Sequence, residues 1–486
     1  RAEGYAGRCE FLREGGFHDH GRILIQNAPR CPKKTCPARG GRAQILHNPL
    51  IGKRECIPPG LTLRFCEGLF ILSTAMNEMN TGLPLSPVTL ELISSAYRVL
   101  VLALAVLAQL YLFVRFREAV RSTRLSKRAA SWAVGAAGVA IVTLFCLSGF
   151  VLARPLAWLD PPPALQAALF YLPSLWSVGS LTCALILLSL RVAGEAGRRA
   201  GRIWRDATGR KPAVPVDTGR RRFVKAGVGT LAAAPFVLSG YGAAYAGRAY
   251  TVEERSLPFG LPLRVVQLTD IHAGLTMTRR EMRRYAEEVI ALEPDLFVLT
   301  GDYVSNTSAF LPDCLEEMAR VRARYGTFAV LGNHDHWYVP SGELTALFRE
   351  SGIPLLRNEN RVIATAQGPF AVAGIDDLNA GRPDLQAALR GLTPAVPTIL
   401  LSHRPEVFPD AAARGVALTL AGHYHGGQIK LTLPRREISV AHLRTPYPEG
   451  LFRIGESRLY VSRGIGTSLT PVRLNARPEV TVLNLA

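Results

Sequence analysis

Apolar residues form long unbroken runs in the first half of the chain, at residues 92–114, 129–153, 164–190 and 226–246. The second and third runs contain no charged residue, and the first contains only Arg98. A helix of about 20 apolar residues crosses the hydrocarbon core of a bilayer. Buried helices of soluble proteins are the alternative, but they rarely continue so far without a charge. We therefore predict four transmembrane helices, of which the last, rich in Gly and Ala, has the weakest pattern.

After residue 250 the pattern changes to short apolar runs that alternate with amphipathic ones. Several of the short runs are apolar at nearly every position, as in strands that are buried on both faces. The predicted strands are residues 263–268, 295–300, 327–332, 369–375, 397–402, 416–422, 458–462 and 479–485. Helical patterns lie between them, for example at 279–292 and 315–324. This alternation predicts a layered α/β domain over residues 251–486, preceded by a membrane region over residues 79–250.

The formal net charge of +19 is typical of nucleic-acid binding or of basic membrane loops. Basic residues gather in two segments that flank the apolar runs, 115–128 and 191–225, whereas 154–163 has one Arg and one Asp. Because cytoplasmic loops collect Lys and Arg, the two basic segments are predicted to be cytoplasmic. The N-terminus and residues 251–486 would then face the extracytoplasmic side of an inner or plasma membrane. Topology accounts for much of the charge, so no nucleic-acid partner is expected.

The basic flank of the fourth apolar run has a second interpretation. The sequence "GRRRFVKAG" places Arg220 and Arg221 ahead of Phe223, Val224 and Lys225, an arrangement that resembles the twin-arginine export signal. An "AYAG" sequence at residues 244–247 is a cue for cleavage after an A-x-A pattern. We expect export of the domain by this route. An ordinary basic flank is the alternative, and cleavage after Ala246 stays open.

The N-terminal segment, residues 1–78, has no clear period of either helix or strand. It contains five of the eight cysteines, namely Cys9, Cys31, Cys36, Cys56 and Cys66. One interpretation is an extracellular disulfide module. The other, which we favour, is a non-native upstream extension, with translation beginning at Met76 or Met79.

Residues that can bind metals follow five of the predicted strands. They are Asp270 and His272 in "QLTDIH", Asp302 in "LTGDY", Asn333, His334 and Asp335 in "LGNHDHW", His403 in "LSHRPE", and His423 and His425 in "LAGHYHGG". The carboxyl ends of strands are where α/β sheets usually build their sites. Each motif alone is weak, because capping acids and structural histidines are common. Five in order, each at a strand end, predict one common site.

The number and type of donors point to two metal ions. Without His334 and Asp335 there are seven donors, and a single zinc site takes four ligands. Carboxylate, imidazole and amide donors without thiolate suit Mn, Fe or Zn. Cys314 is expected to be packed rather than to bind metal. Along an extended chain, His423 and His425 would lie on one side and Tyr424 on the other.

In this order the motifs resemble those of the calcineurin-like metallophosphoesterase superfamily, from about residue 263 to the end of the chain. "GHYHGGQ" and "SHRPE" are most similar to its bacterial membrane-attached branch, which includes UDP-diacylglucosamine diphosphatase-like and twin-arginine-exported phosphodiesterases. The resemblance implies a four-layer αββα sandwich. Members of this branch usually carry Thr or Ser where Tyr424 stands, and the effect of this departure on substrate choice stays open.

The resemblance also implies a role for each residue. Two divalent ions, with manganese favoured, would be bound, one by Asp270, His272 and His425 and the other by Asn333, His403 and His423, with Asp302 bridging them. His334 would act beside the scissile phosphate as general acid or transition-state stabiliser, and Asp335 would orient it.

The expected function is that of a membrane-anchored phosphohydrolase. It would cleave phosphodiester or diphosphate bonds with a metal-bridging hydroxide, on a phosphate ester that is plausibly lipid-linked. A cytoplasmic diacylglucosamine substrate conflicts with the predicted topology. The alternative is a non-catalytic membrane sensor with a ligand-binding phosphoesterase-like domain. A transporter is disfavoured because the apolar runs lack central ionisable residues.

Overall fold

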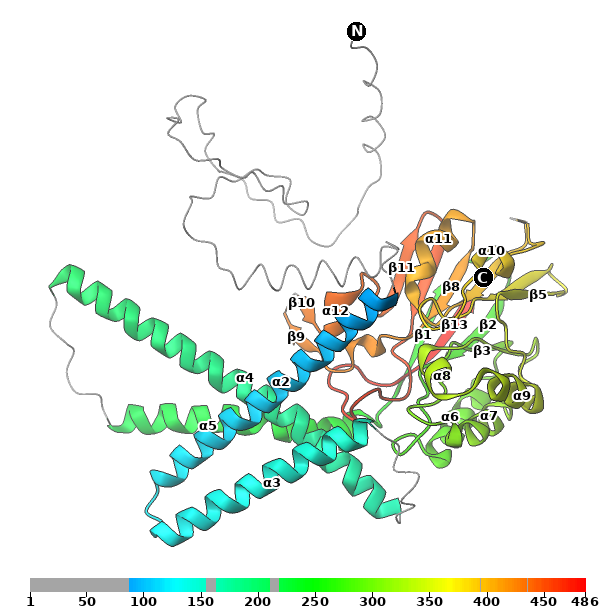
Figure 1. The fold of residues 1–486 in the computed structure, drawn as a ribbon. Helices are drawn as coiled ribbons and strands as arrows, with labels where there is room; N and C mark the ends of the chain where they lie inside the picture. Colours follow the sequence, from blue (N-terminus) through cyan, green and yellow to red (C-terminus); the bar gives the residue numbers. More distant parts are fainter. Residues whose placement is uncertain (1–86, 154–162, 210–217, 394, 435) are drawn as a thin grey trace, which may run out of the picture. The chain divides into compact units, whose positions relative to one another are not determined.

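The computed structural model describes residues 87–153, 163–209, 218–393, 395–434 and 436–486 (Figure 1). The cysteine-rich segment, and both interpretations of it, therefore lie outside the described residues. The same holds for the side chains of Arg220 and Arg221 in the twin-arginine pattern.

Four long helices precede the α/β domain: α2 (Pro87–Arg121), α3 (Lys127–Ala153), α4 (Pro163–Thr208) and α5 (Thr218–Tyr241), which ends in a π-helical turn, η2 (Gly242–Ala246). Within the described residues, three segments are long and apolar enough to cross a membrane, at Lys127–Ser148, Tyr171–Thr208 and Arg222–Tyr245. The predicted span 92–114 lies in α2, where the side chains before residue 99 are not described. A fourth span therefore stays a prediction.

Helix α4 is much longer than the predicted span 164–190, because the basic segment after it is helical to Thr208 instead of forming a loop. Ala, Arg and Glu in this segment are strong helix formers. Glu195 also accepts hydrogen bonds from Arg198 and Arg199, one turn further along the helix. Nearer its start, α4 is joined to α2 where Trp176 Nε1 donates to Gln109 Oε1 at 3.0 Å.

The α/β domain contains two large sheets and a small one. The first sheet has the order β1 (Thr251–Leu257), β13 (Glu479–Leu485), β2 (Leu263–Leu268), β3 (Leu296–Leu299) and β4 (Thr327–Ala329). The second has the order β11 (Gly450–Ile454), β12 (Ser457–Val461), β8 (Leu418–Ala421), β7 (Thr398–Leu401), β6 (Phe370–Gly374) and β5 (Glu359–Ile363). A short hairpin pairs β9 (Leu431–Leu433) with β10 (Arg436–Ile438).

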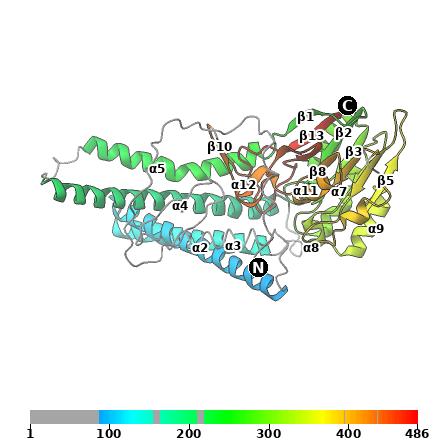
Figure 2. The same cartoon turned by 90° about the horizontal axis from the view of Figure 1, so that it is seen from above.

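The two large sheets pack face to face, and helices cover their outer faces (Figures 1 and 2). Alternation along β2 shows the arrangement: Val265 belongs to the core between the sheets, and Val266 belongs to the core under the helices. The helices on the first sheet are α6 (Arg279–Ala291), α7 (Leu311–Met318) and α9 (Ser341–Ser351), and those on the second are α10 (Leu385–Ala388) and α11 (Phe408–Ala413). The predicted four-layer αββα sandwich is confirmed.

All eight predicted strands are present, but five further strands were not predicted and one predicted helix has other bounds. Strands β1, β5 and β9 to β11 were not predicted because much of their surface is exposed and their apolar patterns are short. The helix predicted at 315–324 instead runs from Leu311 to Met318. Pro312 stands in its first turn, a position that favours a helix start. Cys314 is fully buried in this helix, as predicted.

Parallel pairing decides where the site forms. Strands β2, β3 and β4 are parallel, as are β6, β7, β8 and β12. The carboxyl ends of parallel strands meet at one edge of a sheet. The loops that follow β2, β3, β4, β7 and β8 carry the metal-binding motifs.

Candidate metal centre

The backbone is unusual at the predicted ligands. Ten described residues other than glycine have positive φ, and five of them are predicted ligands: Asp270 (51°), His272 (51°), Asp302 (57°), His423 (75°) and His425 (52°). L-residues adopt this region rarely and at a cost. Such strain persists only where the surrounding structure fixes it, and it concentrates at functional sites. The backbone therefore marks this loop cluster independently of the side-chain types.

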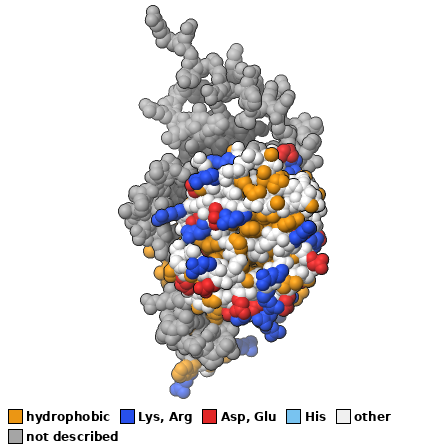
Figure 3. Space-filling view, turned by 90° about the vertical axis from the view of Figure 1, so that its right-hand side faces the viewer, with side chains coloured by type: hydrophobic (Ala, Val, Ile, Leu, Met, Phe, Trp, Pro, Cys, Tyr) orange, Lys and Arg blue, Asp and Glu red, His pale blue; other side chains and the backbone are white. Residues whose placement is uncertain are grey.

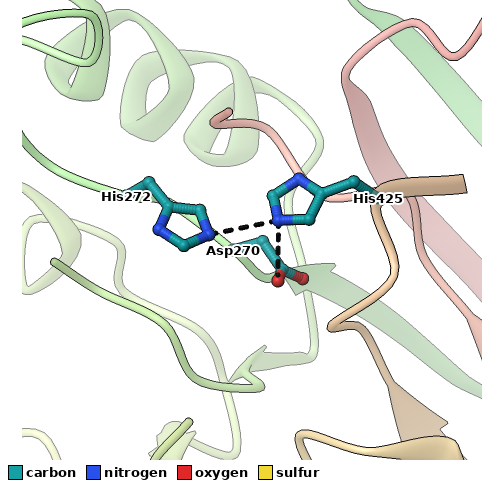
Figure 4. A group of neighbouring side chains, drawn as sticks. All are labelled: Asp270, His272 and His425. Atoms are coloured by element: carbon teal, nitrogen blue, oxygen red, sulfur yellow. Dashed lines mark hydrogen bonds and ion pairs between the residues drawn. The ribbon is translucent and has the colours of Figure 1, made fainter. Parts of the chain in front are cut away.

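Asp270, His272 and His425 form the first ligand cluster (Figure 4). The Nε2 atoms of His272 and His425 lie 3.1 Å apart, and Nε2 of His425 lies 3.3 Å from Oδ1 of Asp270. All three side chains are buried, and their donor atoms point at one another. One cation could contact all three.

The second ligand cluster contains His403 and His423, which lie together with Asp302. Asn333 is its third predicted member. Nδ1 of His423 lies 3.2 Å from Nε2 of His403. The other ring nitrogen of His403, Nδ1, donates to the carbonyl of Thr300 at 2.8 Å, which leaves Nε2 free to bind metal. Asn333 is buried at the start of the short helix α8 (Asn333–Tyr338).

Asp302 lies between the two clusters. Its Oδ2 atom is 3.6 Å from Nε2 of His272 and 3.3 Å from Nε2 of His403. Its Oδ1 atom accepts a hydrogen bond from the backbone N–H of His334 at 2.8 Å. One carboxylate oxygen thus faces both clusters, which is the position that a bridging ligand must take.

His334 and Asp335 lie at the start of α8, beside Asp302. Nδ1 of His334 donates to the carbonyl of Ser305 at 2.6 Å. Asp335 accepts backbone N–H bonds from Gly332, Asp302 and Tyr303, at 2.8, 2.9 and 2.8 Å. The His334 ring is therefore held by Ser305, while Asp335 accepts from the backbone of neighbouring loops. The predicted role of Asp335 in orienting His334 stays a prediction. His334 also falls in a possible donor group with His272 and Asp302, and its predicted non-ligand role stays a prediction.

Burial and neighbouring charge shift the protonation of the site in opposite directions. Burial lowers the pKa of His272 to about 3 and those of His423 and His425 well below the usual range. Burial opposes ionisation of Asp302, yet the neighbouring imidazoles, His403 first, hold its pKa well below its ordinary value. Burial likewise disfavours a charged His403, but Asp302 raises its pKa to about 10. The proton on His403 is the one that a cation would displace.

The residues fit a pair of divalent cations. The Nε2 atoms of His272 and His425 face each other at 3.1 Å although burial keeps both rings neutral. Two imidazole nitrogens that face each other beside a carboxylate oxygen are the arrangement that a shared cation stabilises. The donors are nitrogen and oxygen atoms only, since Cys314 is packed inside α7. This set suits Mn, Fe or Zn.

The turn after β8 differs from the predicted extended chain. Strand β8 ends at Ala421, His423 and His425 both have positive φ, and Tyr424 between them is in the right-handed helical region. The two histidines therefore do not lie on one side by strand alternation. The turn instead directs one to each cluster. The Tyr424 ring packs edge-on against that of His423, with 4.7 Å between centroids, and its hydroxyl donates to Glu406 at 2.6 Å. At Gly422 a Cβ atom would collide with Oδ2 of Asp270, so only glycine fits.

Two arginines at the site were not predicted. Arg404 donates from Nη2 to Oδ1 of Asn333 at 3.0 Å and from Nη1 to Nε2 of His423 at 2.7 Å, and Asp377 pairs with its Nε. Arg473 is fully buried, with Nη2 3.0 Å from Nδ1 of His425. Arg404 stands in the "SHRPE" motif next to His403, and that adjacency was the available signal. Arg473 had none, because it follows His425 by 48 residues.

Comparison with known proteins identifies the family. The family described as calcineurin-like phosphoesterase matches residues 263–427. The chain is 30% identical to the uncharacterized metallophosphoesterase YkuE of Bacillus subtilis, over 97% of that protein and 55% of this chain. It is 33% identical to phosphodiesterase YaeI of Escherichia coli, over 98% of that protein and 55% of this chain. This chain belongs to the calcineurin-like metallophosphoesterase family.

The family assignment makes this protein a metal-dependent phosphoesterase, of a fold family that binds two divalent metals. It is also 35% identical to the transmembrane protein with metallophosphoesterase domain of Bos taurus, over 46% of this chain and 53% of that protein. The chain thus spans about half the length of that relative. Together with the three apolar helices, this similarity supports association of the metallophosphoesterase with a membrane.

Proposed function

We propose that this metallophosphoesterase is anchored in a membrane and hydrolyses phosphodiester or diphosphate bonds with two divalent cations, preferably manganese. The supporting observation is the position of Asp302, whose Oδ2 atom lies within 3.6 Å of a ligand nitrogen from each cluster. The first ion would be held by Asp270, His272 and His425, and the second by Asn333, His403 and His423. A carboxylate that only stabilised the fold would not need to face a ligand nitrogen from each cluster.

When bound, two such cations would neutralise phosphate charge and activate water for attack. The chain's own residues supply the rest. Hydrolysis leaves an oxygen on the departing group that needs a proton. Because Nδ1 of His334 is committed to the Ser305 carbonyl, its Nε2 atom is the one that can carry this proton. The ring is steadied by Trp337, at 5.2 Å between centroids.

We further propose that the substrate is lipid-linked and that the catalytic domain lies on the extracytoplasmic side. The first point rests on the membrane anchor, which holds the domain near lipid head groups. The second rests on the basic residues between the apolar helices, which favour a cytoplasmic position of those segments. The twin-arginine pattern at the start of α5 supports the same orientation.

The activity is tested with the purified full chain, bis-p-nitrophenyl phosphate and a chelation cycle. We expect chelation to abolish hydrolysis and Mn²⁺ to restore it better than Mg²⁺. A His442→Gln variant, which removes a histidine outside both clusters, is the matched control and should hydrolyse normally. Turnover that survives chelation would refute the metal mechanism.

The substrate class and the topology need separate measurements. A screen with phospholipids, UDP-diacylglucosamine and p-nitrophenyl phosphate should show diesters or diphosphates hydrolysed faster than the monoester. A reporter fused after Ala486 that is active only outside the cytoplasm should give a signal. A cytoplasmic signal would contradict the proposed orientation and would bring a cytoplasmic lipid substrate back into consideration.

A further inference from the structure

An exposed apolar surface lies on the β9–β10 hairpin and the short helix that follows it, α12 (Val440–Arg444). We name it the apolar hairpin surface, and its members are Leu431, Leu433, Ile438, Val440 and Leu443. Leu443 is 80% exposed, Val440 65% and Leu431 58%. Large apolar side chains scattered singly need no explanation, but five within 13 residues of the sequence indicate an interaction site. On the face drawn in Figure 3, Lys, Arg, Asp and Glu side chains lie among the apolar ones instead.

The charges beside the apolar hairpin surface are basic. Arg436 and Arg444 are exposed, and neither forms a salt bridge with another residue in the described part of the chain. The neighbouring acid, Glu437, is paired with Lys430 at 3.0 Å. Apolar side chains flanked by uncompensated arginines are what binds the interface of an anionic bilayer.

This surface is attached directly to the turn that holds the metal ligands. A Cβ atom at Gly427, two residues after His425, would collide with Ser439, which caps α12. At the other end of α12, the hydroxyl of Thr445 donates to Glu406 at 2.8 Å. Glu406 accepts a second bond at 2.6 Å from Tyr424, which stands between His423 and His425. The apolar hairpin surface and the metal centre are therefore connected through direct contacts at both ends of α12.

The hairpin is also tied to the end of the last apolar helix. The backbone N–H of Lys430, just before β9, donates to the carbonyl of Leu474 at 2.9 Å. The adjacent N–H of Arg473 donates to the carbonyl of Gly242, where α5 ends, at 3.3 Å. If α5 crosses the bilayer, as its length and composition allow, the hairpin starts close to where that helix emerges. Lipid is therefore the binding partner that lies closest to the apolar hairpin surface.

We propose that the apolar hairpin surface inserts into the interfacial region of an anionic lipid bilayer. The side chains of Leu431, Val440 and Leu443 enter the acyl boundary, and Arg436 and Arg444 contact lipid phosphates. The metal centre is thereby held at the depth of phosphate groups in the same bilayer. Docking itself is independent of catalysis, whereas its consequence for lipid substrates rests on the proposed function.

The depth of insertion is measured with a spin label on the full chain in nanodiscs of phosphatidylglycerol and phosphatidylcholine. The eight native cysteines are replaced, and the label is attached at Leu443→Cys. We expect collisions with oxygen to increase and collisions with a water-soluble nickel chelate to fall, relative to detergent. Val362→Cys is the matched control, since Val362 is 57% exposed on β5, an edge strand of the six-stranded sheet that is separate from the β9–β10 hairpin. The label at position 362 should remain exposed to water and accessible to the nickel chelate.

Two results would overturn the proposal. Equal nickel accessibility at positions 443 and 362 would show that the surface stays in water. Protection at 443 from both oxygen and nickel, in nanodiscs and in detergent, would show that protein covers the surface, from this chain or a second copy. Arg436→Gln with Arg444→Gln should reduce insertion in anionic nanodiscs and change little in neutral ones. An equal insertion depth in anionic and neutral nanodiscs would show that Arg436 and Arg444 do not contribute to docking.

A kinetic experiment separates docking from chemistry. Val440→Ser with Leu443→Ser should raise KM for a phosphodiester lipid in vesicles about tenfold, because exposed CH₂ groups that enter the bilayer are lost. The same variant should hydrolyse soluble bis-p-nitrophenyl phosphate normally. Equal loss with both substrates would contradict docking. If neither substrate is hydrolysed by the unmodified protein, the proposed function fails while the depth measurement still decides the surface.

Discussion

The two ligand clusters share Asp302 but differ in charge. The first cluster has a carboxylate of its own, Asp270, beside two neutral imidazoles. The second has an amide and two imidazoles, and Arg404 donates to two of its three members, Asn333 and His423. Each cluster has a guanidinium beside one imidazole, Arg473 at His425 and Arg404 at His423. The second cluster differs because it contains the protonated His403 and gains only the shared carboxylate.

Because of this difference in charge, the two ions should bind with different affinities. Opposite charges a few ångströms apart in a partly buried site attract by several kcal/mol, and like charges repel by similar amounts. The first cluster should bind its ion more tightly, and the second should exchange its ion more easily.

Asp302→Asn should have the largest effect, because it removes the one carboxylate that the two clusters share. The amide keeps the shape but removes the shared charge, so we expect both ions to be lost and turnover to fall by about 10³ or more. Elemental analysis of the purified full chain, with bis-p-nitrophenyl phosphate hydrolysis, measures both. Asp313→Asn, on the outer helix α7, is the matched control. Two retained ions in Asp302→Asn would show that this carboxylate does not bridge.

His334→Gln should leave both clusters loaded and remove only the chemistry. Loss of a positioned general acid typically costs about 10² to 10⁴ in rate. Metal content, measured as before, should match the unmodified protein. If the ions are lost along with turnover, His334 is a ligand, and the group that it forms with His272 and Asp302 becomes a third binding site.

Calorimetric metal titration should sharpen the difference between the clusters. We expect two Mn²⁺ binding steps whose dissociation constants differ by at least about tenfold. His425→Ala should remove the tighter step and His403→Ala the weaker one. Arg404→Met should bring the two constants closer together, because it removes the repelling charge. The reverse assignment of the two steps would contradict the electrostatic argument.

Tyr424→Phe should have the smallest effect. The hydroxyl contacts Glu406 and no predicted ligand, and Thr445 remains as a second donor to that carboxylate. We expect a loss of stability of about 1 kcal/mol and less than about threefold change in hydrolysis of the soluble diester, measured by thermal unfolding and initial rates. A larger kinetic effect would mean that Tyr424 reaches the substrate.

Much of the fold followed from the sequence because buried strands leave apolar runs that end in polar motifs. Strands β2 and β13 were predicted residue for residue, and the motif after β2 lies with Asp302, His334 and His425 from three other strand ends. The features that were missed depend on distant partners. Arg404 belongs to the site because it donates to Asn333, 71 residues away. Arg473 belongs to it because it contacts His425. The left-handed backbone at His423 and His425 also leaves no local signal, since Gly422 and Gly426 indicate a turn but not which histidine turns.

The backbone hydrogen bonds around Asp335 and the Thr300 bond to His403 have a consequence for how the protein acquires its ions. The ligands are arranged by the packed layers of the sandwich and by bonds that involve no metal. The conformational entropy of ordering them is lost during folding, before any ion arrives. Unlike small zinc domains, which unfold without their ion, this protein should exchange or lose its metals while its circular dichroism stays unchanged. Metal supply could then switch its activity on and off many times within the lifetime of one folded molecule.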